Sequence, residues 1–561
     1  MSDNRSGAAD RGKHERGFTK ILAAQGVVMT EQGSCPAEVL AEKARKIDDR
    51  VFVLFEEQRI TYAQMNERAN RVANGLSELE VKPGDGVALM MPNRPEWLYV
   101  FFAIQKLGAY VVPVNIALKG DGLAYILNHS EAKVLFVATE LAETLGAVRE
   151  KLTGLRQVII ADASEAPSDV LPSAAQATTL ARLMDAPASE LSTAIDPNAI
   201  ACLMYTSGTT GLPKGVVMRY QAMAQFGLFS AGYQEGDVLY TCLPLFHGNA
   251  LFLTVLRGLV GGFTVALSPR FSASRFWDEI RHYGATTFNA LGAMIPILLK
   301  QPPRPNDADN PVRIVFSAAT PAWAWEEFEK RFNLTIVEGY GAVDGGGFSL
   351  FNPGIAPKGS MGRPPPGVEA RVVDEQGTEM PVGEAGNLVF KIDNPVARRV
   401  EYFKNPEASE AKVRDGWFFT GDLAYKDAGG NFYFVDRKTD SMRRRGENIS
   451  SYEVEKIVNQ HPAVLESAAF GVPSELGEDD VMIAVVLKPG QHATPEELAR
   501  FCEERMAKFM VPRYIDFRES LPKTETHRVQ KAALKKDGIT STAWDREKPA
   551  PRKDTRPLPT A

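Results

Sequence analysis

A loop rich in glycine and hydroxyl side chains carries the clearest chemical signal in this chain. Residues 205–215 read YTSGTTGLPKG and follow the apolar run 199–204, so we expect a loop that leaves a buried strand. Glycines let backbone N–H groups face an anion, hydroxyls add donors, and Lys214 adds positive charge. The loop is not a Walker A motif, because Pro213 stands where that motif needs glycine. A solvated turn is the alternative, but the order and spacing favour phosphate binding.

Further segments carry residue types that suit a nucleotide, a metal ion or a small acid. Tyr340 lies between two glycines in EGYGAVD (338–344) and offers a flat face for adenine, with an ordinary core tyrosine as the alternative. Asp344 ends this segment and suits Mg²⁺, held directly or through water. Asp422 is a single acceptor for two ribose hydroxyls, although Thr-Gly-Asp alone would be only a turn. The remaining segments are PLFH (244–247), FTGD (419–422), DR (436–437) and RGENI (445–449), followed by EVE (453–455).

In this order and spacing, these segments resemble the motifs of the adenylate-forming superfamily, which comprises acyl-CoA synthetases, adenylation domains and luciferases. The resemblance covers nearly all of residues 35–536 and is closer to fatty-acid and crotonobetaine/carnitine ligases than to acetyl-specific ones. It implies an ATP-dependent acyl-CoA synthetase. A carboxylic acid and ATP would give acyl-AMP and pyrophosphate, and CoA would then give acyl-CoA and AMP. ATP, Mg²⁺ and coenzyme A are the implied cofactors.

The resemblance also implies roles for individual residues. Arg528, Lys214 and Thr206 would be catalytic, Thr439 would be the hinge residue, and Asp344 would be the metal ligand. The loop would hold the departing phosphates, while a metal and cations offset charge in the transition state. The residues expected to contact ATP or AMP are Thr206, Ser207, Gly208, Thr209, Thr210, Gly211, Lys214, Ser317, Ala318, Ala319, Glu338, Gly339, Tyr340, Gly341, Asp422 and Arg437.

Two more groups of residues would contact the acid and coenzyme A. His247 would gate the acyl tunnel, with a satisfied core histidine as the alternative. Small neighbours indicate room in the acyl pocket, whose expected residues are His247, Gly248, Asn249, Ala342 and Gly345. Coenzyme A would contact the segment that opens the C-terminal domain, through Arg445, Gly446 and Glu447. Arg443 and Arg444 are further candidates for its phosphates, with a solvated basic turn as the alternative.

Three positions depart from the family pattern. The metal motif commonly ends Thr-Glu but here ends Val343-Asp344, which removes a hydroxyl donor and shortens the carboxylate arm. Thr439 stands where the family often has Lys or Asp. Arg528 occupies the place of the adenylation lysine and replaces a compact ammonium with a planar fork. We expect Arg528 still to bridge the carboxylate and the phosphate, with Lys531 as a weaker alternative.

Other readings of the resemblance stay open. An adenylating enzyme that loads a carrier protein is the nearest rival, and a catalytically weakened nucleotide- or acyl-binding paralogue is the second. A luciferase-type use is less favoured. The expected partner is a small-molecule carboxylic acid, and a homodimer is an expectation at the level of the family.

Composition narrows the class of protein. The 561 residues carry 64 Lys and Arg against 70 Asp and Glu, a formal charge of −6, which argues against a nucleic-acid binder. Four scattered cysteines have no ligand-like spacing, which fits a reducing cytosol. The most apolar stretch, 250–267, is interrupted by Arg257 and glycines, so we expect a buried helix and a strand rather than a membrane segment. The protein is expected to be cytoplasmic.

The elements that position these motifs alternate between strands and helices. Short apolar runs at 87–91, 109–114, 134–137 and 158–160 predict buried strands, and Thr61 is placed to cap a helix over 62–79. We therefore expect an α/β fold: a large multi-layer N-terminal domain with a β-rich part, and a small mobile α+β domain. The expected boundaries are 1–17 (disordered), 18–437 (large domain, β-rich over 367–434), 438–543 (small domain) and 544–561 (disordered tail).

Overall fold

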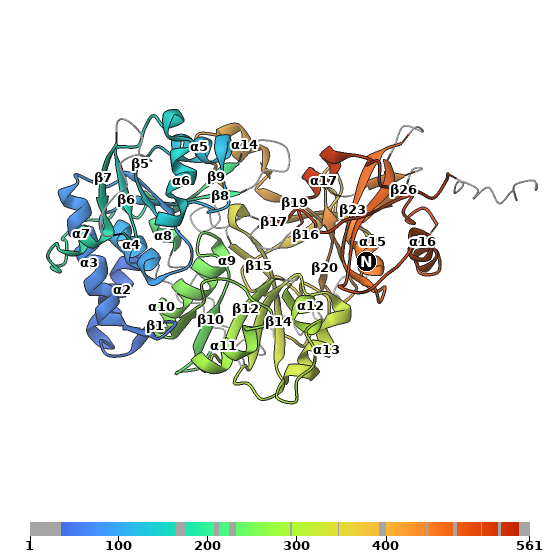
Figure 1. Cartoon of the computed structure of the whole chain (residues 1–561), viewed down its shortest axis with the longest axis horizontal. Helices are drawn as coiled ribbons and strands as arrows, with labels where there is room; N and C mark the ends of the chain where they lie inside the picture. Colours follow the sequence, from blue (N-terminus) through green and yellow to red (C-terminus); the bar gives the residue numbers. More distant parts are fainter. Residues whose placement is uncertain are drawn as a thin grey trace, which may run out of the picture. The chain divides into compact units, whose positions relative to one another are not determined.

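The computed structural model describes residues 35–163, 175–206, 213–223, 232–291, 294–345, 347–391, 400–438, 440, 442–444, 447–474, 479–506, 508–524 and 529–548 (Figure 1). The chain forms two compact units. The first comprises Met1–Arg371, Val389–Thr420 and Gly429–Phe432, and the second comprises Val372–Leu388, Gly421–Ala428 and Tyr433–Ala561. The expected disordered segment 1–17 lies outside the described residues, as do residues 549–561.

One seven-stranded sheet of the first unit carries the phosphate loop at its edge. All neighbouring strands are parallel except the last pair, so the expectation of a largely parallel, buried sheet is confirmed. The strands in spatial order are β7 (Gln176–Thr179), β6 (Gln157–Ile160), β5 (Ala132–Val137), β3 (Gly86–Met90), β4 (Tyr110–Pro113), β8 (Ile200–Thr206) and β9 (Lys214–Arg219).

An eight-stranded sheet of the same unit carries the expected adenine and metal motif. Its central strands are parallel, and each edge ends in an antiparallel pair. The strands in spatial order are β15 (Gly347–Asn352), β14 (Thr335–Ala342), β13 (Ile314–Ala318), β12 (Thr287–Leu291), β10 (Val238–Thr241), β11 (Thr264–Leu267), β1 (Val51–Phe55) and β2 (Gln58–Thr61).

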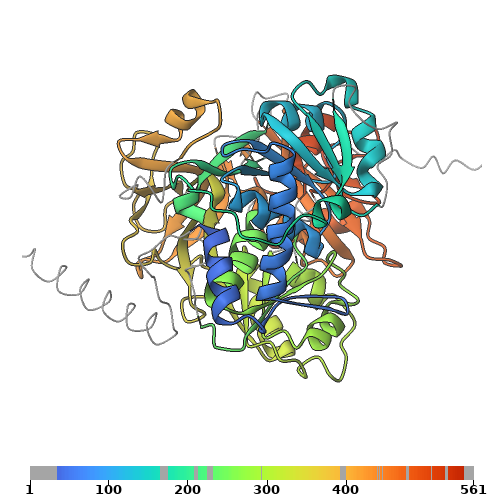
Figure 2. The ribbon, with the colours of Figure 1, turned by 90° about the vertical axis from the view of Figure 1, so that its left-hand side faces the viewer.

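Helices α3 (Tyr62–Glu78) and α4 (Pro95–Lys106) share one apolar core with residues of both sheets. The hydroxyl of Thr61 accepts a hydrogen bond from the N–H of Gln64, so the predicted cap of α3 is confirmed. Helix α2 (Pro36–Lys46) lies beside α3 (Figure 2). On β3, Val87 and Leu89 enter this core while Ala88 and Met90 enter a second one. Burial on both faces explains the continuous apolar run of the strand.

The remaining helices of the first unit cover the outer faces or connect strands. The stretch 250–267 forms helical turns followed by β11, as expected, and no helix among the described residues is long and apolar enough to span a membrane. These helices are α5 (Gly120–His129), α6 (Ala142–Gly146), α7 (Leu180–Met184), α8 (Tyr220–Met223), α9 (Gly248–Ala250), the π-helical segment η5 (Leu251–Leu256), α10 (Arg257–Gly261), α11 (Phe276–Tyr283), α12 (Met294–Leu299), α13 (Ala322–Phe332) and α14 (Pro406–Ala411).

The expected β-rich part forms a sheet of five short strands. In spatial order these are β16 (Ala370–Val373), β17 (Gly386–Lys391), β19 (Trp417–Lys426) and β18 (Val413–Arg414), with β20 (Phe432–Arg437) also pairing β19. Turns of Gly, Asp and Asn join them, as the sequence predicts.

The C-terminal part of the second unit is a four-stranded sheet with three helices. Its strands are β23 (Val464–Pro473), β24 (Asp479–Leu487), β25 (Tyr514–Phe517) and β26 (Trp544–Asp545). The helices are α15 (Ser451–Val458), α16 (Pro495–Glu503) and α17 (Lys531–Asp537), and a hairpin of β21 (Met442–Arg444) and β22 (Glu447–Ile449) completes the unit.

The start of the expected C-terminal tail is ordered. Strand β26 pairs with β25, and Asp545 forms an ion pair with Arg513 at 3.2 Å. The prediction of disorder from residue 544 is therefore wrong for residues 544–548. Proline and charge suggested a solvated tail, but Asp545 is itself buried and meets the half-buried Arg513, which only the folded sheet places beside it.

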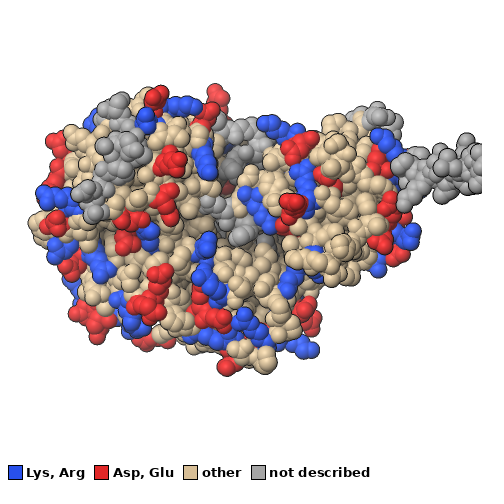
Figure 3. Space-filling view, viewed as in Figure 1, with Lys and Arg blue, Asp and Glu red and all other residues tan. Residues whose placement is uncertain are grey.

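Acidic and basic side chains are intermixed on the face of the molecule in Figure 3. Among the described residues that form this face, neither sign of charge dominates a broad area. This distribution agrees with a formal charge of only −6 over 561 residues.

Candidate functional site

The two ends of the phosphate loop are held together by strand pairing. Thr206 is the last residue of β8, Lys214 is the first residue of β9, and the two are antiparallel partners. The loop thus leaves a buried strand and returns on its neighbour. The intervening predicted contacts, Ser207, Gly208, Thr209, Thr210 and Gly211, lie outside the described residues.

A distant segment, residues 400–404, pairs with β9 beside this loop. The N–H of Val217 donates to the carbonyl of Glu401 at 2.9 Å, and the N–H of Phe403 donates to the carbonyl of Gly215 at 2.8 Å. Tyr402 lies between these bonds, is buried, and has its ring centroid 5.2 Å from the Lys214 Nζ. The pairing places an aromatic face against the predicted catalytic lysine.

Asp344, the predicted metal ligand, accepts a hydrogen bond from this tyrosine. The Tyr402 hydroxyl donates to Asp344 Oδ2 at 2.6 Å, and Lys412 Nζ lies 3.6 Å from the same oxygen. Burial and the nearby carboxylate raise the pKa of Tyr402, so its hydroxyl remains a donor near neutral pH. Lys214, Tyr402, Asp344 and Lys412 therefore form one cluster, which we call the Asp344 cluster.

Tyr402 and Lys412 were not singled out by the sequence. Each lies more than 55 residues from Asp344 along the chain, and neither belongs to a recognised motif. A single tyrosine and a single lysine form no sequence pattern that would predict a site. Their place beside Asp344 becomes visible only in the structure, where residues 400–404 pair with β9.

Glu338 holds the backbone of the loop at Ala319 and Thr320, where the adenine is expected to bind. This carboxylate is buried and accepts hydrogen bonds from the N–H groups of Ala319 and Thr320, the latter at 3.2 Å. Burial raises the pKa of Glu338 to about 7, although these hydrogen bonds act in the opposite direction. Ser317 is also buried and accepts a hydrogen bond from the Thr320 hydroxyl at 2.7 Å. Both side chains thus hold the loop, while Ala319 adopts a left-handed conformation with φ of 65°.

Tyr340 is half-buried on β14, in the position expected for an adenine platform. Its ring stacks on Phe390, with centroids 6.0 Å apart and planes inclined by 30°. Gly339 is buried and Gly341 is exposed beside it, and Ala318 is half-buried on the neighbouring strand β13. These backbone positions are consistent with a flat binding surface at the ends of β13 and β14.

The predicted acyl-pocket residues lie close to the metal motif. His247 precedes α9 and packs against Phe246, with ring centroids 4.7 Å apart. Burial lowers the pKa of His247 to about 4, so its ring is neutral at pH 7, and its Nε2 has no hydrogen-bond partner among the described residues. A Cβ added at Gly248 would lie 3.2 Å from the Val343 side chain. The predicted acyl pocket and the predicted metal motif therefore adjoin at Gly248 and Val343.

The other two expected pocket residues are also packed closely. The Asn249 Oδ1 accepts a hydrogen bond from Asn289 at 3.0 Å, so this amide is oriented by its neighbour. A Cβ added at Gly345 would lie 2.3 Å from the ring of Phe418, which leaves no room for a side chain there. Ala342 ends β14, between Gly341 and Val343.

In the second unit, the expected ribose-binding pair is brought together. Asp422 on β19 and Arg437 on β20 approach to 3.8 Å between Oδ1 and Nε. Thr439, Arg445, Gly446 and Arg528 lie outside the described residues, and Glu447 is described only as a backbone position of β22.

The side chain of Lys531 forms its contacts with residues of the second unit. Its Nζ lies 2.8 Å from Glu455 Oε1 and donates to the hydroxyl of Ser451. Glu455 is half-buried and also accepts a hydrogen bond from the N–H of Ala469 at 2.8 Å. The weaker alternative of Lys531 as the adenylation cation is therefore not supported, because its ammonium already neutralises this half-buried carboxylate.

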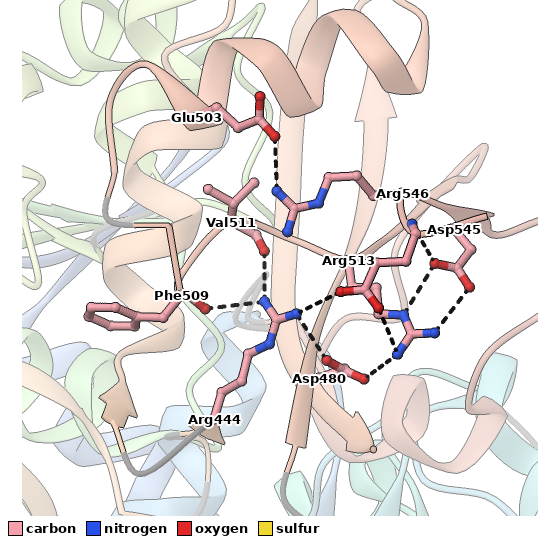
Figure 4. A network of polar contacts seen from close by, with 9 residues as sticks. Arg444, Asp480, Glu503, Phe509, Val511, Arg513, Asp545 and Arg546 are labelled. Atoms are coloured by element: carbon pink, nitrogen blue, oxygen red, sulfur yellow. Dashed lines mark hydrogen bonds and ion pairs between the residues drawn. The ribbon is translucent and has the colours of Figure 1, made fainter. Parts of the chain in front are cut away.

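Arg444 likewise cannot serve as the candidate contact for coenzyme A. Its side chain is 4% exposed and lies 3.1 Å from Asp480, with further hydrogen bonds to the carbonyls of Phe509 and Val511 (Figure 4). Arg513 contacts the other oxygen of Asp480 at 2.8 Å. We call this set the Asp480 cluster. The run of three arginines suggested a solvated or ligand-binding turn, but the fold uses Arg444 as an internal ion-pair partner.

The fit of a divalent cation rests on Asp344. The described residues contain no group of three or more His, Cys, Asp or Glu side chains that could hold a metal ion. A single carboxylate nevertheless suits Mg²⁺, because this ion is commonly held by one or two carboxylates together with substrate phosphates. Among the described residues, Tyr402 and Lys412 both contact Oδ2 of Asp344, which leaves Oδ1 as the oxygen for a cation.

Comparison with protein families gives two matches along the chain. The family model for AMP-binding enzymes matches residues 40–398. The model for the C-terminal domain of AMP-binding enzymes matches residues 453–528.

Similar curated proteins include crotonobetaine/carnitine–CoA ligases. The one from Escherichia coli O7:K1 (strain IAI39) is 32% identical over 486 residues, covering 85% of this chain and 93% of the relative. The one from Salmonella choleraesuis (strain SC-B67) is 32% identical over 502 residues, covering 87% and 96%.

Similar solved structures include ligases that act on aromatic acids. An anthranilate CoA ligase in complex with anthranoyl-AMP has a TM-score of 0.81 and 28% identity, covering 90% of this chain and 98% of the other. A benzoate CoA ligase from Burkholderia xenovorans LB400 has a TM-score of 0.78 and 28% identity, covering 89% and 99%. An O-succinylbenzoate CoA synthetase from Bacillus subtilis, in complex with ATP and magnesium, has a TM-score of 0.75 and 27% identity, covering 89% and 99%.

Proposed function

Because the chain belongs to the family of AMP-binding enzymes, we propose that it is an ATP-dependent acyl-CoA synthetase, an acid–thiol ligase that forms AMP. The single observation that carries the proposal is the Asp344 cluster. It connects Lys214, at the end of the phosphate loop, to Asp344, the predicted metal ligand, through the side chain of Tyr402. Relatives of similar length are named as CoA ligases, which supports this chemistry.

In the first half-reaction, the carboxylate of the acid would attack the α-phosphate of ATP, and pyrophosphate would leave. Thr206 and Lys214 would bind the departing phosphates, together with Ser207, Gly208, Thr209, Thr210 and Gly211. Asp344 would hold Mg²⁺, which offsets the negative charge of the phosphates. Arg528 would supply a further cation between the carboxylate and the α-phosphate.

The nucleotide base would lie on Tyr340, flanked by Gly339, Gly341, Ala318 and Ala319. Glu338 and Ser317 would position this surface without touching the base. Glu338 accepts hydrogen bonds from the backbone at 319–320, and Ser317 accepts one from the Thr320 hydroxyl. The Asp422 and Arg437 pair would bind the ribose hydroxyls.

In the second half-reaction, the thiol of coenzyme A would displace AMP. Arg445, Gly446 and Glu447 would contact coenzyme A after residues 438–543 rotate about Thr439, relative to residues 18–437. A mobile domain allows one site to present a cation for adenylation and then to open a path for a thiol.

The acid would be a small molecule that occupies the space beside His247, Gly248, Asn249, Ala342 and Gly345. The half-buried, neutral ring of His247, whose buried Nε2 has no hydrogen-bond partner among the described residues, suits an acid with a polar group near its carboxylate. The proposal places the enzyme in the cytoplasm, and a homodimer is an expectation at the level of the family.

The test is pyrophosphate release with ATP and Mg²⁺ across short, medium, long, aromatic and carnitine-like acids, with and without coenzyme A. Release that depends on one class of acid and rises with coenzyme A is the expected result. Release that is indifferent to coenzyme A would favour loading of a carrier protein. Binding of ATP without release, unchanged by Arg528→Lys, would favour a weakened paralogue.

A further inference from the structure

Lys412 has no role in the mechanism above, yet it lies in direct contact with the predicted metal ligand. We propose that Lys412 is an ATP-phosphate-binding residue, paired with Asp344 in the nucleotide-free protein, and that Tyr402 positions this pair. The inference rests on the proposed function, because it deepens the description of the same site.

The ammonium of Lys412 is held from three sides. It donates to the carbonyl of Thr420 at 3.0 Å, lies 5.4 Å from the centroid of the Phe418 ring, and lies 3.6 Å from Asp344 Oδ2. Its side chain is 26% exposed. Most surface lysines are flexible and strongly hydrated, so a lysine that is fixed in this way has already lost much of its side-chain entropy. A phosphate oxygen would bind it at a lower entropic cost.

The charges of the Asp344 cluster do not balance. Lys214 and Lys412 each bring one positive charge, and Asp344 brings one negative charge. Both lysines are organised around Tyr402, whose ring faces Lys214 and whose hydroxyl is bonded to Asp344. A half-buried cluster with one excess positive charge favours an anion, and the polyphosphate of ATP is the anion of the proposed reaction.

Lys412 also supplies donors at a place where the metal motif lacks one. Val343 has only methyl groups, and its side chain packs near Gly248, toward the acid side. The Lys412 ammonium carries three N–H donors, of which the Thr420 carbonyl uses one. The ammonium can therefore keep its contact with Thr420 while it turns a second donor from Asp344 to a phosphate oxygen.

Magnesium should partly replace this lysine. Asp344, which already contacts Lys412, would also hold Mg²⁺ in the proposed reaction, so each cation would lower the affinity of the carboxylate for the other. Binding of ATP without metal should thus depend on Lys412 more strongly than binding of the magnesium complex.

Calorimetric titration of the full-length protein with ATP, in EDTA and in excess Mg²⁺, tests the proposal. In EDTA, Lys412→Met should weaken ATP binding about 10- to 100-fold, the range for one charge-assisted hydrogen bond. In Mg²⁺ the loss should shrink to about threefold. Lys358→Met is the control, because this lysine pairs with Glu329 at 3.0 Å, away from the cluster, and should change neither value.

A second variant separates charge from structure. Lys412→Gln removes the charge but keeps a donor for the Thr420 carbonyl. If Lys412 binds phosphate, Gln should weaken ATP binding in EDTA as Met does. Wild-type affinity of either variant in EDTA, or wild-type affinity of Gln with loss only in Met, would overturn the proposal.

These titrations contain no acid and no coenzyme A, so they are independent of turnover. A wild-type protein that binds ATP through Lys412 but releases no pyrophosphate with any acid would contradict the proposed function alone. A wild-type enzyme that releases pyrophosphate while Lys412→Met and Lys412→Gln bind ATP normally would contradict this inference alone.

Discussion

Two charged clusters of this protein, one in each unit, use carboxylates in opposite ways. In the Asp480 cluster, Arg444 and Asp480 are 4% and 5% exposed, and the two oxygens of Asp480 meet two different arginines. In the Asp344 cluster, Lys412 and Asp344 are 26% and 18% exposed, and Tyr402 and Lys412 approach the same oxygen of Asp344. A buried network in which both oxygens of the carboxylate are paired is suited to holding a fold, whereas a half-exposed one retains capacity for a ligand. The predictions below test this difference.

The largest effect is expected from breaking the buried Asp480 cluster. Asp480→Asn removes the buried carboxylate that Arg444 and Arg513 share and leaves them the more exposed Glu547, so unfolding of the second unit should become easier by about 3–5 kcal/mol. Urea denaturation followed by fluorescence measures this loss. Glu503→Gln is the matched control, because Glu503 is 52% exposed in its pair with Arg546, and should cost less than about 1 kcal/mol. Equal, small losses in both variants would remove the distinction between the two clusters.

The open cluster should respond in activity instead of stability. Asp344→Asn should lower kcat/KM for ATP by roughly 100- to 1,000-fold, because a metal-binding carboxylate acts on charge that develops in the transition state. The free energy of unfolding should change by less than about 1 kcal/mol. Steady-state pyrophosphate release and urea denaturation of the same preparation give both values. A large loss of stability with normal turnover would assign Asp344 a structural role.

Glu338 shows what burial does to a carboxylate that has no cationic partner among the described residues. Its pKa of about 7 lies above the value of 4.5 for the unfolded chain, so the native state binds more protons between these limits. Stability from this group is therefore complete below pH 4.5 and is lost as the pH rises through 7. Relative to Glu338→Gln, the wild type should lose roughly 3 kcal/mol between pH 4.5 and pH 8. Parallel stability curves for the two proteins over this range would contradict the prediction.

The smallest effect is expected from one hydroxyl. Tyr402→Phe keeps the ring against Lys214 but removes the hydrogen bond to Asp344, so the Mg²⁺ concentration for half-maximal pyrophosphate release should rise roughly tenfold. Tyr433→Phe is the control, since it removes a comparable tyrosine–aspartate bond to Asp427 in the second unit. A similar Mg²⁺ dependence of both variants and the wild type would show that Tyr402 does not position the metal ligand.

Much of the fold and part of the candidate site follow from local patterns. The buried strands, the capped helix after Thr61 and the ordered motifs could be predicted because each depends on residues that are adjacent in the chain. The spacing of apolar residues predicts a helix, and glycines that follow an apolar run predict a loop. Disorder from residue 544 was a wrong prediction because composition reports average solvation, whereas Asp545 is held by one specific arginine, Arg513.

By itself, the sequence determined the family, the order of the motifs and the residue types available for nucleotide chemistry. Only the tertiary structure decided which cations serve which carboxylate. Arg444 and Lys412 lie in similarly polar stretches, but one enters a core beside Asp480 and the other remains half-open beside Asp344. Which cation pairs with which carboxylate depends on strand pairings between segments far apart in the chain. These pairings fix the burial of the charges and the distance between them, and both determine the interaction energy of each ion pair.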